Sequence, residues 1–160
     1  MPDNIFYHYG DMTLDVSVIF DHYMYKFTVA PDYVVGLSRG GLVPAVCLSH
    51  KFGVPLIPLK WSTRDFVEKD EDTLQKLIDL ADSKKRLLIV DDIFDTGETF
   101  MKISEVFERN YIDGALPVFA SLVTNRTTPN FPVFISQNIL LTGSYIDKGP
   151  SDWLVFPWEN

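Results

Sequence analysis

The segment from Asp91 to Thr99 reads DDIFDTGET and concentrates the side chains of this chain that are most capable of chemistry. Carboxylates such as Asp91 and Asp92 accept hydrogen bonds from sugar hydroxyls or hold the water molecules of a Mg²⁺ ion. The hydroxyls of Thr96 and Thr99 donate to phosphate oxygens. These residue types at this spacing favour a site for a sugar phosphate that carries a metal ion.

The elements around this segment are predicted to hold it at the edge of a sheet. Residues 87–90 form a continuous apolar run typical of a strand buried on both faces, and we expect the strand to stop at the acidic pair. Apolar residues between Phe100 and Arg109 recur at helical spacing. The unpaired N–H groups of the first helical turn, together with a positive φ at Gly97, would converge on an anion.

Two other interpretations of the segment stay open at this point. Asp, Thr and Gly also cap helices in turns that are purely structural. Three aspartates could bind calcium, but Asp91, Asp92 and Asp95 lack the alternating spacing of an EF-hand loop, and no Glu follows at the bidentate position.

DDIFDTGET resembles the phosphoribosyl pyrophosphate (PRPP) binding motif of the type I phosphoribosyltransferases, in which two acidic and two mostly apolar residues precede Asp-Thr-Gly-x-Thr. The resemblance implies that Asp91 and Asp92 contact the ribose hydroxyls and Mg²⁺. In the purine enzymes of this family the third acidic residue, here Asp95, is the candidate general base. The 5′-phosphate would be bound by Asp95, Thr96, Gly97, Glu98 and Thr99.

A second glycine-containing loop lies between a predicted strand, 33–37, and a predicted helix, 42–52. Consecutive glycines let the backbone approach an anion closely, and an arginine beside them can donate several hydrogen bonds to it. The sequence GLSRGGLVPA is similar to the pyrophosphate-binding loop of bacterial xanthine-guanine phosphoribosyltransferases. The resemblance implies that the departing pyrophosphate is held by Ser38, Arg39, Gly40 and Gly41, with Arg39 as a catalytic residue.

The C-terminal segment SDWLVFPWE is rich in aromatic residues. Phe156 and Trp158 are typical of a core, whereas Trp153 follows a turn and could stack on a flat base, which is worth roughly 1–3 kcal/mol in single-strand binders. WLVFPWE looks like the purine-binding end of xanthine-guanine enzymes. By that match Trp153 stacks on the base and the backbone carbonyl of Leu154 accepts from its edge.

The resemblance has one gap, which concerns recognition of the base. Family members that take 6-oxopurines carry a lysine at the end of the strand before this segment, where ASLVTNR places Asn125, or Ser121 in a shifted register. We expect Asn125 to contact the base, and because an amide can donate or accept, an adenine-type substrate stays open. Arg126, if turned inward, would replace the missing cation.

The alternation of strands and helices predicts an α/β fold: a single domain, 1–160, with a parallel sheet covered by helices on both faces. Further strands are predicted at 56–60, 114–123 and 133–135, helices at 11–27 and 73–82, and an irregular segment at 1–10. The polar segment 61–72 is either a solvated surface or, by the resemblance, a flexible lid whose contacting part is 62–65. Residues 124–160 would form a small base-binding hood.

Composition limits the classes of function. A net charge of −8 over 160 residues argues against nonspecific nucleic-acid binding, and the single cysteine, Cys47, lies in an apolar run typical of a core. The chain shows no secretory signal pattern and no apolar run of 18 residues, so we expect a cytoplasmic protein without a membrane partner. The family resemblance suggests a homo-oligomer.

These observations together predict an Mg²⁺-dependent transfer of the phosphoribosyl group from PRPP to a purine base, with guanine, xanthine or hypoxanthine favoured. A regulator that senses PRPP without catalysis is one alternative, although it would be expected to lack the pyrophosphate loop or the hood. A receiver-like signalling domain is another, but it needs a lysine at a later strand end, and the run ending at Val123 has none.

Overall fold

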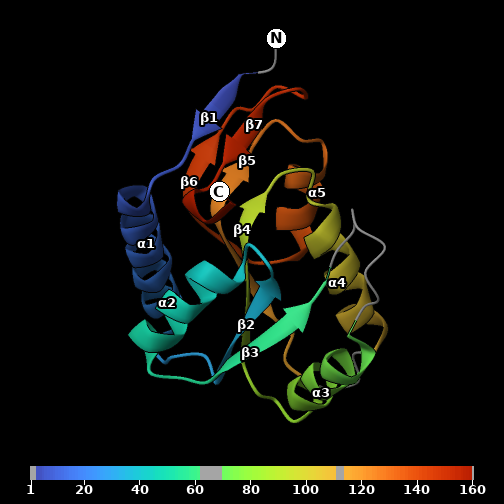
Figure 1. Cartoon of the computed structure of the whole chain (residues 1–160). Coiled ribbons are helices and arrows are strands. Elements are labelled where there is room, and N and C mark those ends of the chain that lie inside the picture. Colours follow the sequence, from blue (N-terminus) through green and yellow to red (C-terminus); the bar gives the residue numbers. More distant parts are fainter. Residues whose placement is uncertain (1–2, 62–69, 111–113, 160) are drawn as a thin grey trace.

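The computed structural model describes residues 3–61, 70–110 and 114–159. A five-stranded sheet with the order β3-β2-β4-β5-β6 forms its centre, and all neighbouring strands are parallel (Figure 1). Its strands are β2 (Tyr33–Ser38), β3 (Leu56–Lys60), β4 (Leu87–Phe94), β5 (Val118–Asn125) and β6 (Leu140–Ile146). A second, two-stranded sheet pairs β1 (Asn4–Phe6) with β7 (Trp153–Val155). The predicted parallel α/β architecture is confirmed.

Helices cover both faces of the five-stranded sheet. One face carries α1 (Tyr9–Phe27) and α2 (Leu42–Phe52), and the other carries α3 (Glu71–Asp82), α4 (Glu98–Arg109) and α5 (Asn130–Gln137) (Figure 1). A short 3-10 helix, Pro157–Glu159, ends the described chain. Within the described ranges, none of the helices combines the length and the apolar character that crossing a bilayer requires.

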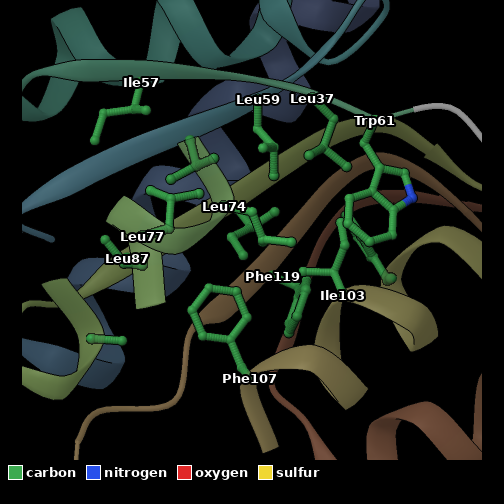
Figure 2. Close-up of a cluster of buried hydrophobic side chains, with 14 of the residues drawn as sticks. Leu37, Ile57, Leu59, Trp61, Leu74, Leu77, Leu87, Ile103, Phe107 and Phe119 are labelled. Atoms are coloured by element: carbon green, nitrogen blue, oxygen red, sulfur yellow. The ribbon is translucent and has the colours of Figure 1, made fainter. Parts of the chain in front are cut away.

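The central strands are apolar on both sides because each side is buried. On β4, Leu87 and Ile89 pack into the core under α3 and α4, whereas Leu88 and Val90 pack into the core under α1 and α2. Figure 2 shows the first of these cores, in which side chains from the helices meet those of the strands. This two-sided packing fixes the strand ends, and therefore the loops that follow them.

The structure corrects the predicted end of the central strand. β4 does not stop before the acidic pair but continues to Phe94. Its pairing with β2 ends at Val90, whereas its pairing with β5 continues from Asp91 opposite Ser121 to Phe94 opposite Thr124. The acidic pair therefore lies within a part of β4 that no longer pairs with β2, and the Gly40–Gly41 loop approaches it closely on that side.

Two other local predictions were wrong. The apolar run 133–135 belongs to α5, and β6 was missed, because periodicity alone cannot tell a short apolar strand from a buried helical segment. Residues 4–6 were expected to be irregular but form β1, whose register pairs Asn4 with Trp153. This strand depends on a partner about 150 positions away in the sequence, so no local sequence pattern predicts it.

A buried carboxyl group joins α1 to β6 and to the N-terminal segment. The Tyr7 hydroxyl donates to Asp15 Oδ2 (2.6 Å) and the Ser144 hydroxyl donates to Asp15 Oδ1 (2.5 Å). Asp15 is only 4% exposed. Burial raises the pKa of Asp15 above its ordinary value, and the two hydrogen bonds only partly oppose this effect.

We expect Asp15→Asn to change the pH dependence of stability. Because the pKa of Asp15 is raised in the folded state, the folded protein binds its proton more tightly than the unfolded chain does. The free energy of unfolding of the wild type should therefore fall, relative to that of the variant, as pH rises through the window between the ordinary and the raised pKa. Urea unfolding at a series of pH values, from the ordinary pKa of an aspartic acid up to weakly alkaline buffer, measures this; a constant difference between the two proteins over that range contradicts it.

Candidate active site

A pocket of about 1110 Å³ lies beyond the carboxyl ends of the central strands. From β2 the chain crosses to β3 on one side, whereas β4 lies on the other side of β2, so the strand order reverses at this point. Such reversals are where open α/β sheets bind their ligands. The lining includes most of the predicted site residues: Ser38, Arg39, Gly40, the run from Asp91 to Thr99, Trp153 and Leu154.

The acidic pair forms the floor of the pocket. The Asp92 N–H donates to Asp91 Oδ1 (2.9 Å) and the Ile93 N–H donates to Asp92 Oδ1 (2.8 Å), so the strand backbone orients both carboxylates. Desolvation raises the pKa of the Asp92 carboxyl, and its interactions with the side chains of Asp91 and Trp158 and with the Ile93 N–H oppose this effect. A cation or a set of hydroxyl donors near Asp92 would stabilise its charged form.

The loop after β2 packs directly on this floor. A Cβ atom on Gly40 would overlap the carboxylate of Asp92, and one on Gly41 would lie 2.5 Å from the Val90 carbonyl oxygen and 2.7 Å from that of Leu37. Gly41 is therefore required by close approach of the loop backbone to the β4 backbone, whereas Gly40 leaves room for the Asp92 carboxylate. Gly41 lies beneath the pocket and does not line it, whereas the side chain of Arg39 is exposed at the pocket.

Gly41→Ala is expected to lower the free energy of unfolding by about 1–3 kcal/mol or more, because the added methyl group meets backbone atoms that cannot rotate away. Gly10→Ala is the matched control, since a Cβ on Gly10 in α1 meets nothing within 4 Å. It should be neutral or stabilising by up to about 1 kcal/mol. Urea denaturation compares the two variants; equal stabilities would contradict the prediction.

The segment after β4 leads into α4 as an anion cradle. Gly97 is the N-cap of α4 with φ 80°, and a Cβ there would also overlap the ring of Phe94, so only glycine fits. The Thr96 carbonyl accepts from Asn130 Nδ2 (2.7 Å), which ties the cradle to the start of α5. The Glu98 carboxylate pairs with Lys102 (2.7 Å), which lowers the pKa of Glu98. The backbone N–H of Glu98 donates to Thr96 Oγ1 in a long hydrogen bond (3.4 Å), which a bound anion would replace.

The surroundings of Asp95 include a charged residue, Lys148, that no sequence motif indicated. Lys148 is 8% exposed, lines the pocket, and places its Nζ 3.4 Å from Asp95 Oδ1. Asn125, predicted to contact the base, does not line the pocket; its Nδ2 donates to Asp95 Oδ1 (3.2 Å). The only sequence signal for Lys148 was its position five residues before Trp153.

The two other candidates for base recognition point elsewhere. Arg126 pairs with Asp147 through Nε (3.2 Å) and lies over the ring of Tyr145, with about half of its side chain exposed, so the hypothesis of an inward Arg126 was wrong. Ser121 is fully buried, and its hydroxyl bonds that of Thr124. Neither residue lines the pocket.

The aromatic C-terminal segment closes one side of the pocket. Trp153 is 44% exposed and lies at the pocket. Phe156 is buried, as predicted for a core residue, and stacks on the half-buried Trp158; both of these side chains also line the pocket. The Trp153 N–H donates to the Asp3 carbonyl, and the Val155 carbonyl accepts from the Tyr7 N–H. Because backbone groups alternate along a strand, the carbonyl of Leu154 points away from β1.

A metal ion would need ligands from a substrate at this site. Within the described ranges, no cluster of three or more His, Cys, Asp or Glu side chains could hold a metal ion. Mg²⁺ is commonly bound by one or two carboxylates together with waters and substrate phosphates. The pair Asp91 and Asp92 fits an Mg²⁺ ion that arrives with a phosphorylated substrate, and does not fit a permanently caged ion.

Comparison with known proteins decides the family. The model of the phosphoribosyl transferase domain matches residues 17–113, which is more than half of the chain. The chain belongs to this family. The family match covers the loop after β2 and the segment 91–99, and it ends before β5. The prediction of a phosphoribosyltransferase is confirmed, and the receiver-like alternative was wrong.

Relatives of this phosphoribosyltransferase extend the likeness along the chain. A xanthine-guanine phosphoribosyltransferase of Idiomarina loihiensis is 25% identical over 128 residues, which cover 79% of this chain and 70% of the relative. The crystal structure of a purine phosphoribosyltransferase from Pyrococcus horikoshii is 27% identical with a TM-score of 0.65, covering 99% of this chain and 95% of that one. The crystal structure of a Neisseria gonorrhoeae protein with bound ppGpp has a TM-score of 0.76 at 16% identity and covers 100% of this chain and 91% of that one. This likeness shows the shared fold.

Proposed function

We propose that this phosphoribosyltransferase transfers the 5-phosphoribosyl group from PRPP to a purine base in an Mg²⁺-dependent reaction, forming a nucleoside monophosphate and pyrophosphate. One observation carries the proposal: three segments far apart in the sequence line a single pocket. They are the arginine-glycine loop after β2, the acidic pair with its anion cradle, and the aromatic strand β7. Relatives named as purine and xanthine-guanine enzymes support the choice of base.

The pocket offers a separate group for each part of PRPP. Asp91 and Asp92 accept hydrogen bonds from the ribose hydroxyls, and the backbone N–H groups at the start of α4, with Thr96 and Thr99, receive the 5′-phosphate. The guanidinium of Arg39 and the backbone of the Ser38–Gly41 loop hold the pyrophosphate. Asp91 or Asp92, together with the substrate, would hold Mg²⁺, which would supply positive charge to offset the charge that develops on the leaving group.

The base is held against the sugar from the other side of the pocket. Trp153 stacks on the ring and the Leu154 carbonyl accepts from its edge. The bond between the anomeric carbon and pyrophosphate breaks with its electron pair leaving on pyrophosphate, and the base nitrogen donates the pair that forms the new bond. Asp95 takes the proton that the base loses. The 17% exposure of the Asp95 side chain shields this transfer from bulk water.

Pyrophosphate release from PRPP and Mg²⁺, measured with guanine, xanthine, hypoxanthine and adenine offered separately, tests the proposal. Release that depends on a purine, with formation of the matching nucleotide, supports it. Binding of PRPP without transfer to any base overturns it in favour of a PRPP-sensing regulator.

Four further expectations stay predictions. Residues 124–160 would act as the base-binding hood of a single domain, 1–160. The flexible lid at 61–72 falls largely outside the described residues, since only 61 and 70–72 are described. A cytoplasmic location and a homo-oligomer, dimer or tetramer, are also expected of a salvage enzyme of this type.

A further inference from the structure

We propose that Lys148, delivered by the loop between β6 and β7, is the residue that selects 6-oxopurines over 6-aminopurines. The inference rests on the proposed function, and it assigns a specificity role to a residue outside the matched family segment. It also accounts for the absence of a lysine at the end of β5. The cation that would contact the purine oxygen comes instead from the loop after the neighbouring strand, β6.

The position of Lys148 is fixed by its backbone. Its N–H donates to Asn125 Oδ1 (3.3 Å) and its carbonyl accepts from the Thr127 hydroxyl (2.9 Å). The Thr127 hydroxyl also donates to Asn125 Oδ1 (2.7 Å). Asn125, at the end of β5, thus clamps the loop after β6, and the same side chain donates to Asp95. Asn125 is a positioning residue for both charged groups.

The ammonium group has capacity left for a ligand. Within the described part of the chain, its polar neighbours are Asp95 Oδ1 at 3.4 Å and the Gly149 carbonyl oxygen at 3.5 Å. An ammonium group carries three donors, so these contacts leave one for the pocket that Lys148 lines. Burial of a cation with such long contacts is costly unless another acceptor arrives.

A 6-oxopurine supplies that acceptor in the matching geometry. Its O6 and N7 lie side by side on one edge of the ring. When N7 carries the proton, this edge presents a donor beside an acceptor. Asp95 and Lys148 present the complement, a carboxylate beside an ammonium group, 3.4 Å apart. Adenine places an amino group at the same position, and its N–H bonds would face the donors of Lys148 without an acceptor.

The alternative is that Lys148 only neutralises Asp95. In that case removal of the charge would impair all bases alike, because Asp95 serves the proton transfer to every purine. A specificity role instead predicts unequal losses between bases. The ratio of rates with hypoxanthine and adenine therefore separates the two roles.

The experiment measures kcat/KM with hypoxanthine and with adenine for the wild type, Lys148→Met and Lys148→Gln, together with PRPP binding in the presence of Mg²⁺. We expect the wild type to prefer hypoxanthine. Loss of a charged hydrogen bond should lower kcat/KM for hypoxanthine roughly 10- to 100-fold, mainly through the KM for the base, with adenine and PRPP little affected. Arg126→Met, which removes an outward-facing cation nearby, is the matched control and should behave as the wild type.

The outcomes are distinct. Equal losses with both bases, no loss, or a wild type that prefers adenine would overturn the role of Lys148 and leave the transferase function standing. A wild type that binds PRPP but transfers to no purine overturns the proposed function and this inference with it. Thermal unfolding of each variant identifies any folding defect. If Lys148→Met is destabilised, Lys148→Gln, which keeps a polar head group, is compared with the wild type instead.

Discussion

Asp95→Asn is expected to lower kcat by about 10²–10⁴-fold while the affinity for PRPP stays nearly unchanged. The substitution keeps the shape of the side chain and can still accept from Asn125 Nδ2, so the anion cradle should remain in place. What the amide cannot do is take the proton that the purine releases. The effect should therefore fall on the chemical step.

Single-turnover rates and equilibrium binding of PRPP separate the two quantities. Asp79→Asn, the same chemical change on the exposed face of α3, is the control and should leave both unchanged. If kcat and PRPP affinity fell together by the same factor, Asp95 would serve binding alone, and the proposed proton transfer would have to be assigned to another group.

Arg39→Met is expected to reduce kcat/KM for PRPP by about 10³-fold or more, as removal of an arginine from a departing phosphate does in phosphoryl transfer. The pocket otherwise has a carboxylate floor, formed by Asp91 and Asp92, which repels the charge that accumulates on pyrophosphate. Lys60 also lines the pocket, so some positive charge remains in the variant. Methionine conserves much of the side-chain length, so the change reports mainly on the guanidinium group.

Arg39→Lys should fall between the wild type and Arg39→Met, because it keeps the charge and loses the planar fork that binds two oxygens at once. Initial rates at varied PRPP give kcat/KM, and inhibition by added pyrophosphate reports on the same subsite. Arg109→Met, at the far end of α4, controls for loss of a surface cation. An Arg39→Met variant with unchanged kcat/KM would remove Arg39 from the site.

Much of the candidate site could be predicted locally, because it consists of short contiguous segments. The DDIFDTGET and SRGG segments each span the junction of an apolar strand and a helix, and the carboxyl ends of parallel strands lie on one edge of the sheet. The strand β3 and the helix α2 have the predicted bounds, since continuous burial and helical spacing are local patterns. The sequence alone thus determined the fold class, the family and the two loops that line the pocket.

The tertiary structure decided what depends on partners distant in the sequence. β1 exists because it pairs with β7, and β4 continues through the acidic pair because β5 still pairs with it after β2 has ended. The proposed recognition of the base also depends on residues distant in the sequence. Lys148 reaches Asp95 only because β5 and β6 are neighbours and Asn125 joins the loops that follow them. A contact between strand ends produces no periodic pattern of apolar residues in the sequence, so only the folded sheet shows it.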